Sequence, residues 1–170
     1  MKKILLICLC FVSSVSLAST IDVGFSTDKT ALPLVLKAIN SSKTSICMAT
    51  YSFTSKPISQ ALLEAKNRSV NIKVVSDWKG NKGKYSAVTF LANHGVNVKL
   101  NSHYSIMHNK FIVIDDSSVE TGSFNYSAGA VNKNAENVIV IWDDKSVARK
   151  YQVECDRLYN QSTIQLKANY

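Results

Sequence analysis

A histidine and a lysine two positions apart are the residues of this chain best suited to chemistry on a phosphate. His108 and Lys110 lie in the sequence Met-His-Asn-Lys-Phe-Ile-Val-Ile-Asp, residues 107–115. On an extended strand alternate side chains share a face, so this spacing would place an imidazole beside an ammonium group. A neutral imidazole can attack phosphorus, and a nearby cation offsets the charge of the phosphate during the attack. Asp115 is expected on the opposite face, as a structural group.

A second polar group follows further along the chain. Ser123 and Asn125, in the sequence Gly-Ser-Phe-Asn, are again two positions apart and can offer a hydroxyl and an amide to one anion. Gly122, just before them, allows a close approach of the backbone. Glu136 precedes the last apolar strand, and a carboxylate held against an imidazole nitrogen fixes its tautomer and stabilises the imidazolium. Taken singly, each group has a simpler interpretation. Ser123 and Asn125 could shape a turn, and Glu136 could be a surface charge. His108 and Lys110 could be a pair that faces solvent.

Together, these residues resemble the signature of the phospholipase D superfamily. Residues 108–125 read His-x-Lys, four residues, Asp, six residues, Gly-Ser-x-Asn, with no departure at any signature position. The short chain, single motif and N-terminal apolar segment resemble the small bacterial periplasmic endonuclease (Nuc-like) branch in particular. The resemblance implies a catalytic set of His108, Lys110, Asp115 and Glu136 and a phosphate-binding set of Lys110, Ser123 and Asn125.

The resemblance also implies how these residues act. His108 would attack phosphorus and form a phosphohistidine, Glu136 would orient the nucleophilic histidine, and Asp115 would support the site from behind. The chain would be an endonuclease with little sequence preference that cuts single- and double-stranded DNA, with RNA as a further substrate. It would leave 5′-phosphates and use neither a divalent metal nor a cofactor.

The leaving oxygen needs a second acid, and one chain supplies a single motif. The economical arrangement is a homodimer with one composite site, in which the second His108 donates the proton, and closed two-fold pairs are the commonest oligomers. Two other functions stay open. One is a phospholipase D or another small phosphodiesterase, since lipids also present a phosphodiester. The other is a non-catalytic nucleic-acid-binding module, against which intact His108 and Lys110 argue.

Residues 1–18 have the pattern of a secretory signal peptide. Lys2 and Lys3 precede an apolar run, and small residues at Ser16 and Ala18 form a cleavage signal. The run is shorter than the roughly 20 residues that span a bilayer, so we expect cleavage and no stable membrane association of the mature protein. The net charge is +8, and loss of the two lysines leaves +6. A periplasmic or secreted basic protein is expected, with polyanions such as DNA as partners.

The remaining cysteines and basic residues each allow two interpretations. Cys47 and Cys155 remain after cleavage, and an oxidising compartment would permit a bridge, although buried reduced thiols are as plausible from spacing alone. His94 is expected to cap a helix end and His103 to lie in a surface loop, with no metal site. The basic loop of residues 78–85, which contains Trp78, Lys79, Lys82, Lys84 and Tyr85, could grip a phosphate backbone or be merely solvated.

Hydrophobic periodicity predicts strands that alternate with helices. We expect helices over residues 32–39, 58–65, 86–93 and 147–158, and strands over 21–25, 45–51, 70–76, 96–100, 107–114, 118–121 and 137–142. A tight turn at Asp115 and Asp116 should join the fifth and sixth strands. The pattern predicts an α/β fold with one mixed β-sheet flanked by helices on both faces, in a single domain over residues 19–170.

Overall fold

The computed structural model describes residues 19–83 and 86–166. The predicted signal peptide lies outside the described residues, as do Lys84 and Tyr85 of the basic loop. The described strands are β1 (Thr20–Phe25), β2 (Ser45–Thr50), β3 (Asn71–Asp77), β4 (Asn97–Asn101), β5 (Phe111–Ile114), β6 (Ser118–Gly122), β7 (Asn137–Trp142) and β8 (Ile164–Gln165). The described helices are α1 (Ala31–Ser41), α2 (Lys56–Asn67), α3 (Trp78–Asn81), α4 (Ala87–Asn93), α5 (Ala128–Asn132) and α6 (Lys145–Gln161).

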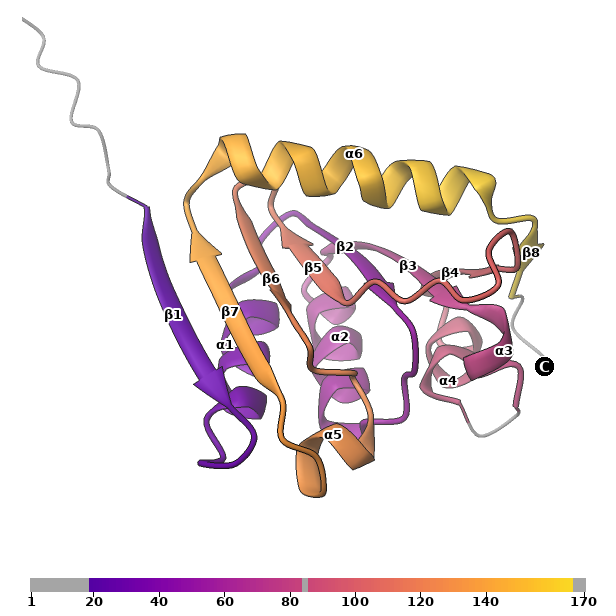
Figure 1. Cartoon of the computed structure of the whole chain (residues 1–170). Coiled ribbons are helices and arrows are strands. Elements are labelled where there is room, and N and C mark those ends of the chain that lie inside the picture. The colour runs from indigo at the N-terminus through magenta and orange to yellow at the C-terminus, as the bar shows by residue number, and fades with distance from the viewer. Residues whose placement is uncertain (1–18, 84–85, 167–170) are drawn as a thin grey trace, which may run out of the picture.

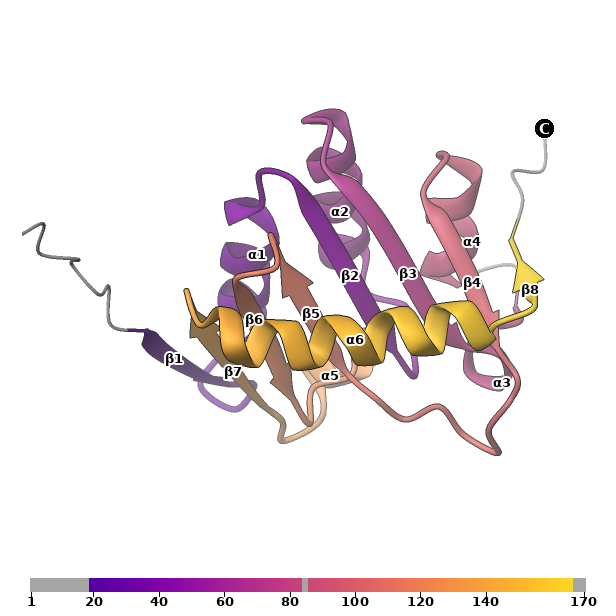
Figure 2. The same ribbon diagram turned by 90° about the horizontal axis from the view of Figure 1, so that it is seen from above.

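The described strands form one mixed sheet in the order β1-β7-β6-β5-β2-β3-β4-β8. The strands β2, β3 and β4 run parallel, whereas β5, β6, β7 and β1 pair antiparallel in succession. Helices α1, α2 and α4 cover one face and α6 crosses the other (Figures 1 and 2). The predicted α/β fold with helices on both faces is therefore confirmed.

The apolar stripes seen in the sequence explain these layers. Buried residues of α1 recur at the spacing of one helical face, namely Leu34, Val35, Ala38 and Ile39. The central strand β2 is buried along nearly its whole length because helices cover both of its faces. Two apolar clusters result, one under α1, α2 and α4 and one under α6.

The predicted strand over residues 107–114 is wrong in its first half. The strand β5 begins only at Phe111, whose partner Ala49 lies one residue before the end of β2, so only one residue of β2 remains beyond this pair. Residues 107–110 belong to no strand. The turn at Asp115 and Asp116 is confirmed, and both residues have positive φ angles of 52° and 53°.

The sequence did not predict α3, α5 or β8. The short helix α3 replaces the first half of the expected basic loop, since the buried carboxylate of Asp77 accepts the N–H of Gly80 at 2.7 Å and caps it. The hydroxyl of Ser127 caps α5 in the same way by accepting the N–H of Ala130. Helices this short carry too little periodicity to be recognised in a sequence.

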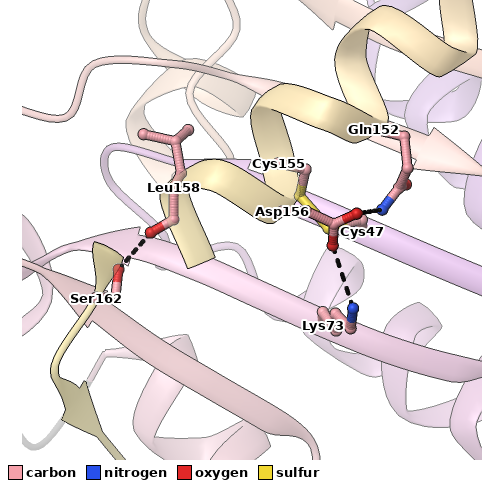
Figure 3. Close-up of a disulfide and its surroundings, with 7 residues drawn as sticks. All are labelled: Cys47, Lys73, Gln152, Cys155, Asp156, Leu158 and Ser162. Atoms are coloured by element: carbon pink, nitrogen blue, oxygen red, sulfur yellow. Dashed lines mark hydrogen bonds and ion pairs between the residues drawn. A yellow bond between two sulfur atoms is a disulfide. The ribbon is translucent and has the colours of Figure 1, made fainter. Parts of the chain in front are cut away.

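A disulfide joins Cys47 of β2 to Cys155 of α6 (Figure 3). Of the two alternatives left open by the sequence, a bridge or two reduced thiols, the bridge is therefore the one that forms. The ammonium group of Lys73 lies 3.1 Å from the carboxylate of Asp156, the residue after Cys155, which also accepts a hydrogen bond from Gln152. The disulfide and the ion pair of Lys73 with Asp156 hold α6 across the sheet. No helix in the described part of the chain is both long enough and apolar enough to span a bilayer.

Candidate active site

His108 lies just before β5, in a segment held by a buried carboxylate. Asp77, at the end of β3, accepts the backbone N–H of Met107 at 2.9 Å, and Met107 itself is buried. This anchoring leaves the side chain of His108 exposed. Its ring lies against that of Tyr51, with 4.7 Å between the ring centroids. The imidazole is therefore open to solvent but restricted in position.

Lys110 is buried beside it, with only 7 % of its surface exposed. Its Nζ donates a hydrogen bond to the backbone oxygen of His108 at 2.9 Å and lies 5.6 Å from the ring centre of Tyr51. Burial lowers the pKa of Lys110, and the negative charge of Glu136 partly offsets this by raising it. The expectation of two side chains side by side on a strand is corrected, because the segment is unpaired and only the lysine is buried.

Ser123 and Glu136 form a direct hydrogen bond at the adjoining end of the sheet. The hydroxyl of Ser123 donates to the Glu136 carboxylate at 2.6 Å, and Asn134 donates its amide hydrogen to the second carboxylate oxygen at 2.9 Å. The backbone N–H of Glu136 donates to the hydroxyl of Ser26 at 2.8 Å. The carboxylate is thus fixed where its charge acts on Lys110.

Gly122 brings β6 and β7 together beside this pair. A Cβ atom at Gly122 would collide with the backbone oxygen of Asn137, so no other residue fits without moving the strands. The Asn137 side chain in turn accepts the backbone N–H of Ser123 at 2.8 Å, and its backbone N–H donates to the Ser123 hydroxyl at 3.0 Å. The glycine of the motif therefore serves the close contact that positions Ser123.

Asn125 carries a polar atom that the protein leaves unsatisfied. Its Oδ1 is buried and has no hydrogen-bond partner among the described residues. Buried polar side-chain atoms nearly always have a partner, and a partner supplied by water or by a ligand is one explanation of an exception. A turn of the amide exchanges its oxygen and nitrogen positions, so the same place can present an N–H to a phosphate oxygen.

The structure does not bring Asp115 to this group. It lies at the opposite end of β5, where its carboxylate accepts the backbone N–H groups of Lys43, Thr44 and Ser45 and the hydroxyl of Thr44, at 2.8 to 2.9 Å. Burial raises the pKa of Asp115, but these hydrogen bonds outweigh it and the pKa lies below its ordinary value. At this position Asp115 ties the turn after α1 to the end of β5, which agrees with the structural role expected for it, and a direct part in catalysis stays a prediction that this placement does not favour.

Glu136 does not reach His108 directly. Both carboxylate oxygens are engaged, by Ser123 and Asn134, and within the described residues no hydrogen bond joins the carboxylate to the imidazole. Orientation of His108 by Glu136 stays a prediction. The structure joins the ammonium group of Lys110 to the backbone oxygen of His108, and places the charge of Glu136 near enough to raise the pKa of Lys110.

Several residues of the site escaped the sequence analysis. Tyr51 directly follows β2, and only the register that pairs Ala49 with Phe111 places it beside His108. Helix α6 supplies Lys150, Tyr151 and Glu154, which line a hollow of about 410 Å³ together with the residues around Lys110. No local signal in the sequence links these positions to the motif, because the contacts depend on how β2 and α6 pack.

The other residues that the sequence analysis singled out, His94, His103 and the basic loop, are not among the contacts of His108 described above. His94 ends α4, as expected, and its ring nitrogen contacts the backbone oxygen of Phe90 at 2.8 Å. His103 is exposed in a loop, with its ring against Tyr104. The Nζ of Lys82 lies 5.0 Å from the ring centre of Trp78. Among residues 19–83 and 86–166, no three His, Cys, Asp or Glu side chains gather as a metal-binding group.

Comparisons with known proteins agree with the motif. The family described as "Cardiolipin synthase, PLD-like domain" matches residues 35–159. A phospholipase D from Rickettsia bellii is 35 % identical over 133 residues, which cover 78 % of this chain and 66 % of the relative. The human mitochondrial cardiolipin hydrolase is 28 % identical over 138 residues, 81 % of this chain and 54 % of that protein.

A solved structure extends the match to most of the described fold. Nuc from Salmonella typhimurium, described as a phospholipase D family member, is 41 % identical and superimposes with a TM-score of 0.84, covering 86 % of this chain and 98 % of that one. By contrast, the chain spans about two thirds of the Rickettsia relative and about half of the human one. The chain therefore belongs to the phospholipase D superfamily, in its Nuc-like branch.

Proposed function

We propose that this protein is an endonuclease that hydrolyses phosphodiester bonds of DNA, and of RNA as a second substrate, through His108. The observation that carries the proposal is that His108 exposes its imidazole, while the buried ammonium group of Lys110 donates to the His108 backbone oxygen, and that both side chains lie against the ring of Tyr51. A phosphodiester repels a nucleophile until its charge is offset, and a buried lysine supplies that charge without reorganisation of solvent. Ser123 and Asn125 offer further polar groups for the phosphate oxygens.

The proposed reaction has two steps that balance. A ring nitrogen of neutral His108 bonds to phosphorus, the bond from phosphorus to the 3′ oxygen breaks, and that oxygen takes a proton from an acid. Water then attacks the phosphohistidine and gives its proton to the same group. The phosphorus–nitrogen bond breaks, which leaves a 5′-phosphate and free His108. Covalent catalysis of this kind divides one difficult displacement into two easier ones.

The acid is proposed to be His108 of a second copy of the chain. The other two histidines lie at the end of α4 and in the loop beside Tyr104, and neither contacts Lys110, Ser123 or Glu136 among the described residues. A homodimer with one composite site supplies the missing group. When wild-type and His108→Ala subunits are mixed and exchanged, each mixed dimer should be nearly inactive. Mixed dimers with half of the wild-type activity would contradict the shared site.

The basic charge of the chain supports a polyanionic substrate such as nucleic acid. The chain carries a net charge of +8, or +6 without Lys2 and Lys3, and polyanions bind basic proteins through counterion release. The rival is a phospholipase or cardiolipin hydrolase, which the names of the Rickettsia and human relatives favour.

Export to the periplasm or the medium is proposed from residues 1–18, and the Cys47–Cys155 disulfide suits an oxidising compartment.

Digestion of supercoiled plasmid and of a single-stranded oligonucleotide by purified protein, in excess EDTA, tests the function. Phosphatidylcholine and cardiolipin vesicles are assayed in parallel. Wild-type protein should cut both nucleic acids and leave the lipids intact, and the His108→Ala variant should lose at least about a thousandfold in rate, as expected for a nucleophile. The His103→Ala variant is the matched control, since His103 is exposed outside the site.

Three results would contradict the proposal. Cleavage of lipid but not of nucleic acid would assign the chemistry to the rival substrate. Cleavage that stops in EDTA and returns with magnesium would reject the metal-free mechanism. Full activity of the His108→Ala variant, with no phosphorylated protein trapped during turnover, would reject the nucleophile.

A further inference from the structure

A cavity of about 710 Å³ lies beside the candidate active site, between the start of α1 and the segment that follows α5. This volume is within the range of about 300 to 1,000 Å³ that small-molecule sites occupy. Two of its lining residues, Ser26 and Asn134, also hydrogen-bond to Glu136, and a third, Phe124, directly follows Ser123. A substrate bound at Ser123 can therefore extend into the cavity without leaving the surface of the protein.

The lining of the cavity combines three kinds of group. Leu32, Pro33 and Val131 provide an apolar surface. The side-chain amides of Asn132 and Asn134 donate within the protein, to the backbone oxygen of Ala128 and the carboxylate of Glu136, each at 2.9 Å. The side-chain oxygens of both asparagines accept no hydrogen bond from the described residues, so each can accept one from a ligand.

Two lysines give the cavity a positive charge. Lys29 and Lys133 both line it and are exposed, and neither forms an ion pair with any residue in the described ranges. None of the lining residues is acidic. An apolar surface, hydrogen-bond acceptors and cations together suit a ligand that has a flat apolar face, N–H donors and a negative charge.

We propose that this cavity binds the nucleotide next to the scissile phosphate in single-stranded nucleic acid. The base lies on the apolar surface and donates its amino or imino hydrogens to Asn132 and Asn134, while Lys29 and Lys133 contact the neighbouring phosphate. A base can enter a cavity only when it is unstacked and unpaired, so single strands are preferred over duplex. A lipid acyl chain carries no donor for the asparagine oxygens. The inference rests on the proposed nuclease function and names the substrate form that it favours.

Two substitutions test the cavity independently. Lys133→Glu reverses one charge at its edge, and Ala135→Trp fills space within it. The matched controls are Lys145→Glu, an exposed lysine at the start of α6, and Asn160→Trp, an exposed position near the end of the same helix.

Three substrates are compared for every protein. The value of kcat/KM is measured on a single-stranded deoxyadenylate 20-mer, on the same strand paired with thymidylate, and on bis(p-nitrophenyl) phosphate. Hydrolysis of phosphatidylcholine vesicles is followed in parallel. Thermal unfolding of each variant checks that it is folded.

The readout is the ratio of kcat/KM on the single strand to kcat/KM on bis(p-nitrophenyl) phosphate, which is too small to span both the active site and the cavity. Lys133→Glu and Ala135→Trp should each lower this ratio at least tenfold and reduce the preference for single strand over duplex. The two controls should keep the ratio within twofold. Lys133→Glu should also reduce the salt dependence of oligonucleotide binding, with a slope smaller by about 0.7, because one phosphate is no longer neutralised.

The outcomes separate the inference from the function on which it rests. A wild-type protein that cleaves the small ester but not the oligonucleotide would contradict the nuclease function, and the cavity assignment with it. Cleavage of both, with a ratio that neither substitution moves, would overturn the cavity assignment alone. Equal cleavage of single strand and duplex by the wild-type protein would overturn it as well. Variants that lose activity only on phosphatidylcholine vesicles would assign the cavity to a lipid.

Discussion

The carboxyl group of Glu120 accepts a hydrogen bond of 2.5 Å from the hydroxyl of Tyr126, and both residues are fully buried. Tyr126 directly follows Asn125, and its backbone oxygen accepts the N–H groups of Thr54 and Ser55 at 3.0 Å. The loop that carries Ser123 and Asn125, which are proposed to bind phosphate, is therefore anchored to β6 through one side chain. Burial raises the pKa of Glu120 to about 8, although the hydrogen bond from Tyr126 lowers it, so the anchor is a neutral acid at pH 7.

The first prediction concerns the pH dependence of stability through Glu120. The unfolded chain releases this proton near the ordinary pKa of 4.5, whereas the folded protein keeps it until about pH 8. The free energy of unfolding should therefore fall as the pH rises through that interval, by at most about 1.4 kcal/mol per pH unit from this group. Glu120→Gln accepts the same hydrogen bond without titrating, and urea unfolding at pH 5, 6, 7 and 8 should show a flatter profile. Parallel profiles for the two proteins would contradict the assignment.

The second prediction concerns the contact at Gly122. Gly122→Ala should destabilise the protein by about 1 to 3 kcal/mol, because the added methyl group collides with the backbone oxygen of Asn137. The strands that hold Ser123 would be pushed apart, so nuclease activity should fall more than stability alone explains. Gly83→Ala is the matched control, since an added Cβ there meets nothing within 4 Å. Equal stability of the two variants in urea would show that the strands adjust freely.

The third prediction separates a structural from a catalytic Asp115. Asp115→Asn should lower the free energy of unfolding by about 1 to 3 kcal/mol at pH 7, because it weakens bonds from three backbone N–H groups and one hydroxyl. The pKa of Asp115 is lowered in the folded protein, so its contribution is complete above its ordinary pKa and is lost as the pH falls through the folded value. The difference in the free energy of unfolding between the wild type and the variant should therefore disappear in acid.

Activity provides the contrast for the same variant. Folded Asp115→Asn protein should retain kcat and KM within about threefold, since the carboxylate lies at the end of β5 away from His108. Lys110→Met, at the other end of the strand, should lose activity by orders of magnitude. A similar loss of kcat in both variants, measured on folded protein, would return Asp115 to the catalytic group.

The fourth prediction concerns the disulfide between Cys47 and Cys155. It closes a loop with a sequence separation of 108, for which chain entropy predicts a stabilisation of about 4 to 5 kcal/mol. Reduction should therefore lower the midpoint of urea unfolding by a large fraction. Without the disulfide, α6 is less firmly tied to β2 and should shift. The shift should reach the site, because Tyr151 of α6 packs on Phe111 with 5.0 Å between ring centroids. A Cys47→Ser/Cys155→Ser double variant that unfolds at the same urea concentration as the oxidised wild type would refute this.

Much of the fold follows from local patterns. The stripe in α1 and the apolar run of β2 carry their own signals, since 3.6-residue and two-residue periodicities are properties of short segments. The prediction was wrong where the outcome depended on a distant partner. Residues 107–110 directly precede an apolar run, but β2 ends one residue beyond the partner of Phe111, and a segment without a neighbouring strand does not become part of a sheet.

In the candidate site, too, some features follow from local sequence and others depend on distant parts of the chain. The residue types and spacing of the motif are enough to suggest phosphate chemistry at His108, Lys110 and Ser123, because that chemistry needs a nucleophile and donors from nearby positions. Whether Asp115 faces the site, which residue lies against the imidazole, and where the substrate continues depend on strand register and helix packing. Tyr51 meets His108 only because β2 pairs with β5, and the cavity near Lys133 forms only where the start of α1 and the end of α5 approach each other. Contacts between segments far apart in the chain leave no periodic trace in sequence, so the tertiary structure alone decides them.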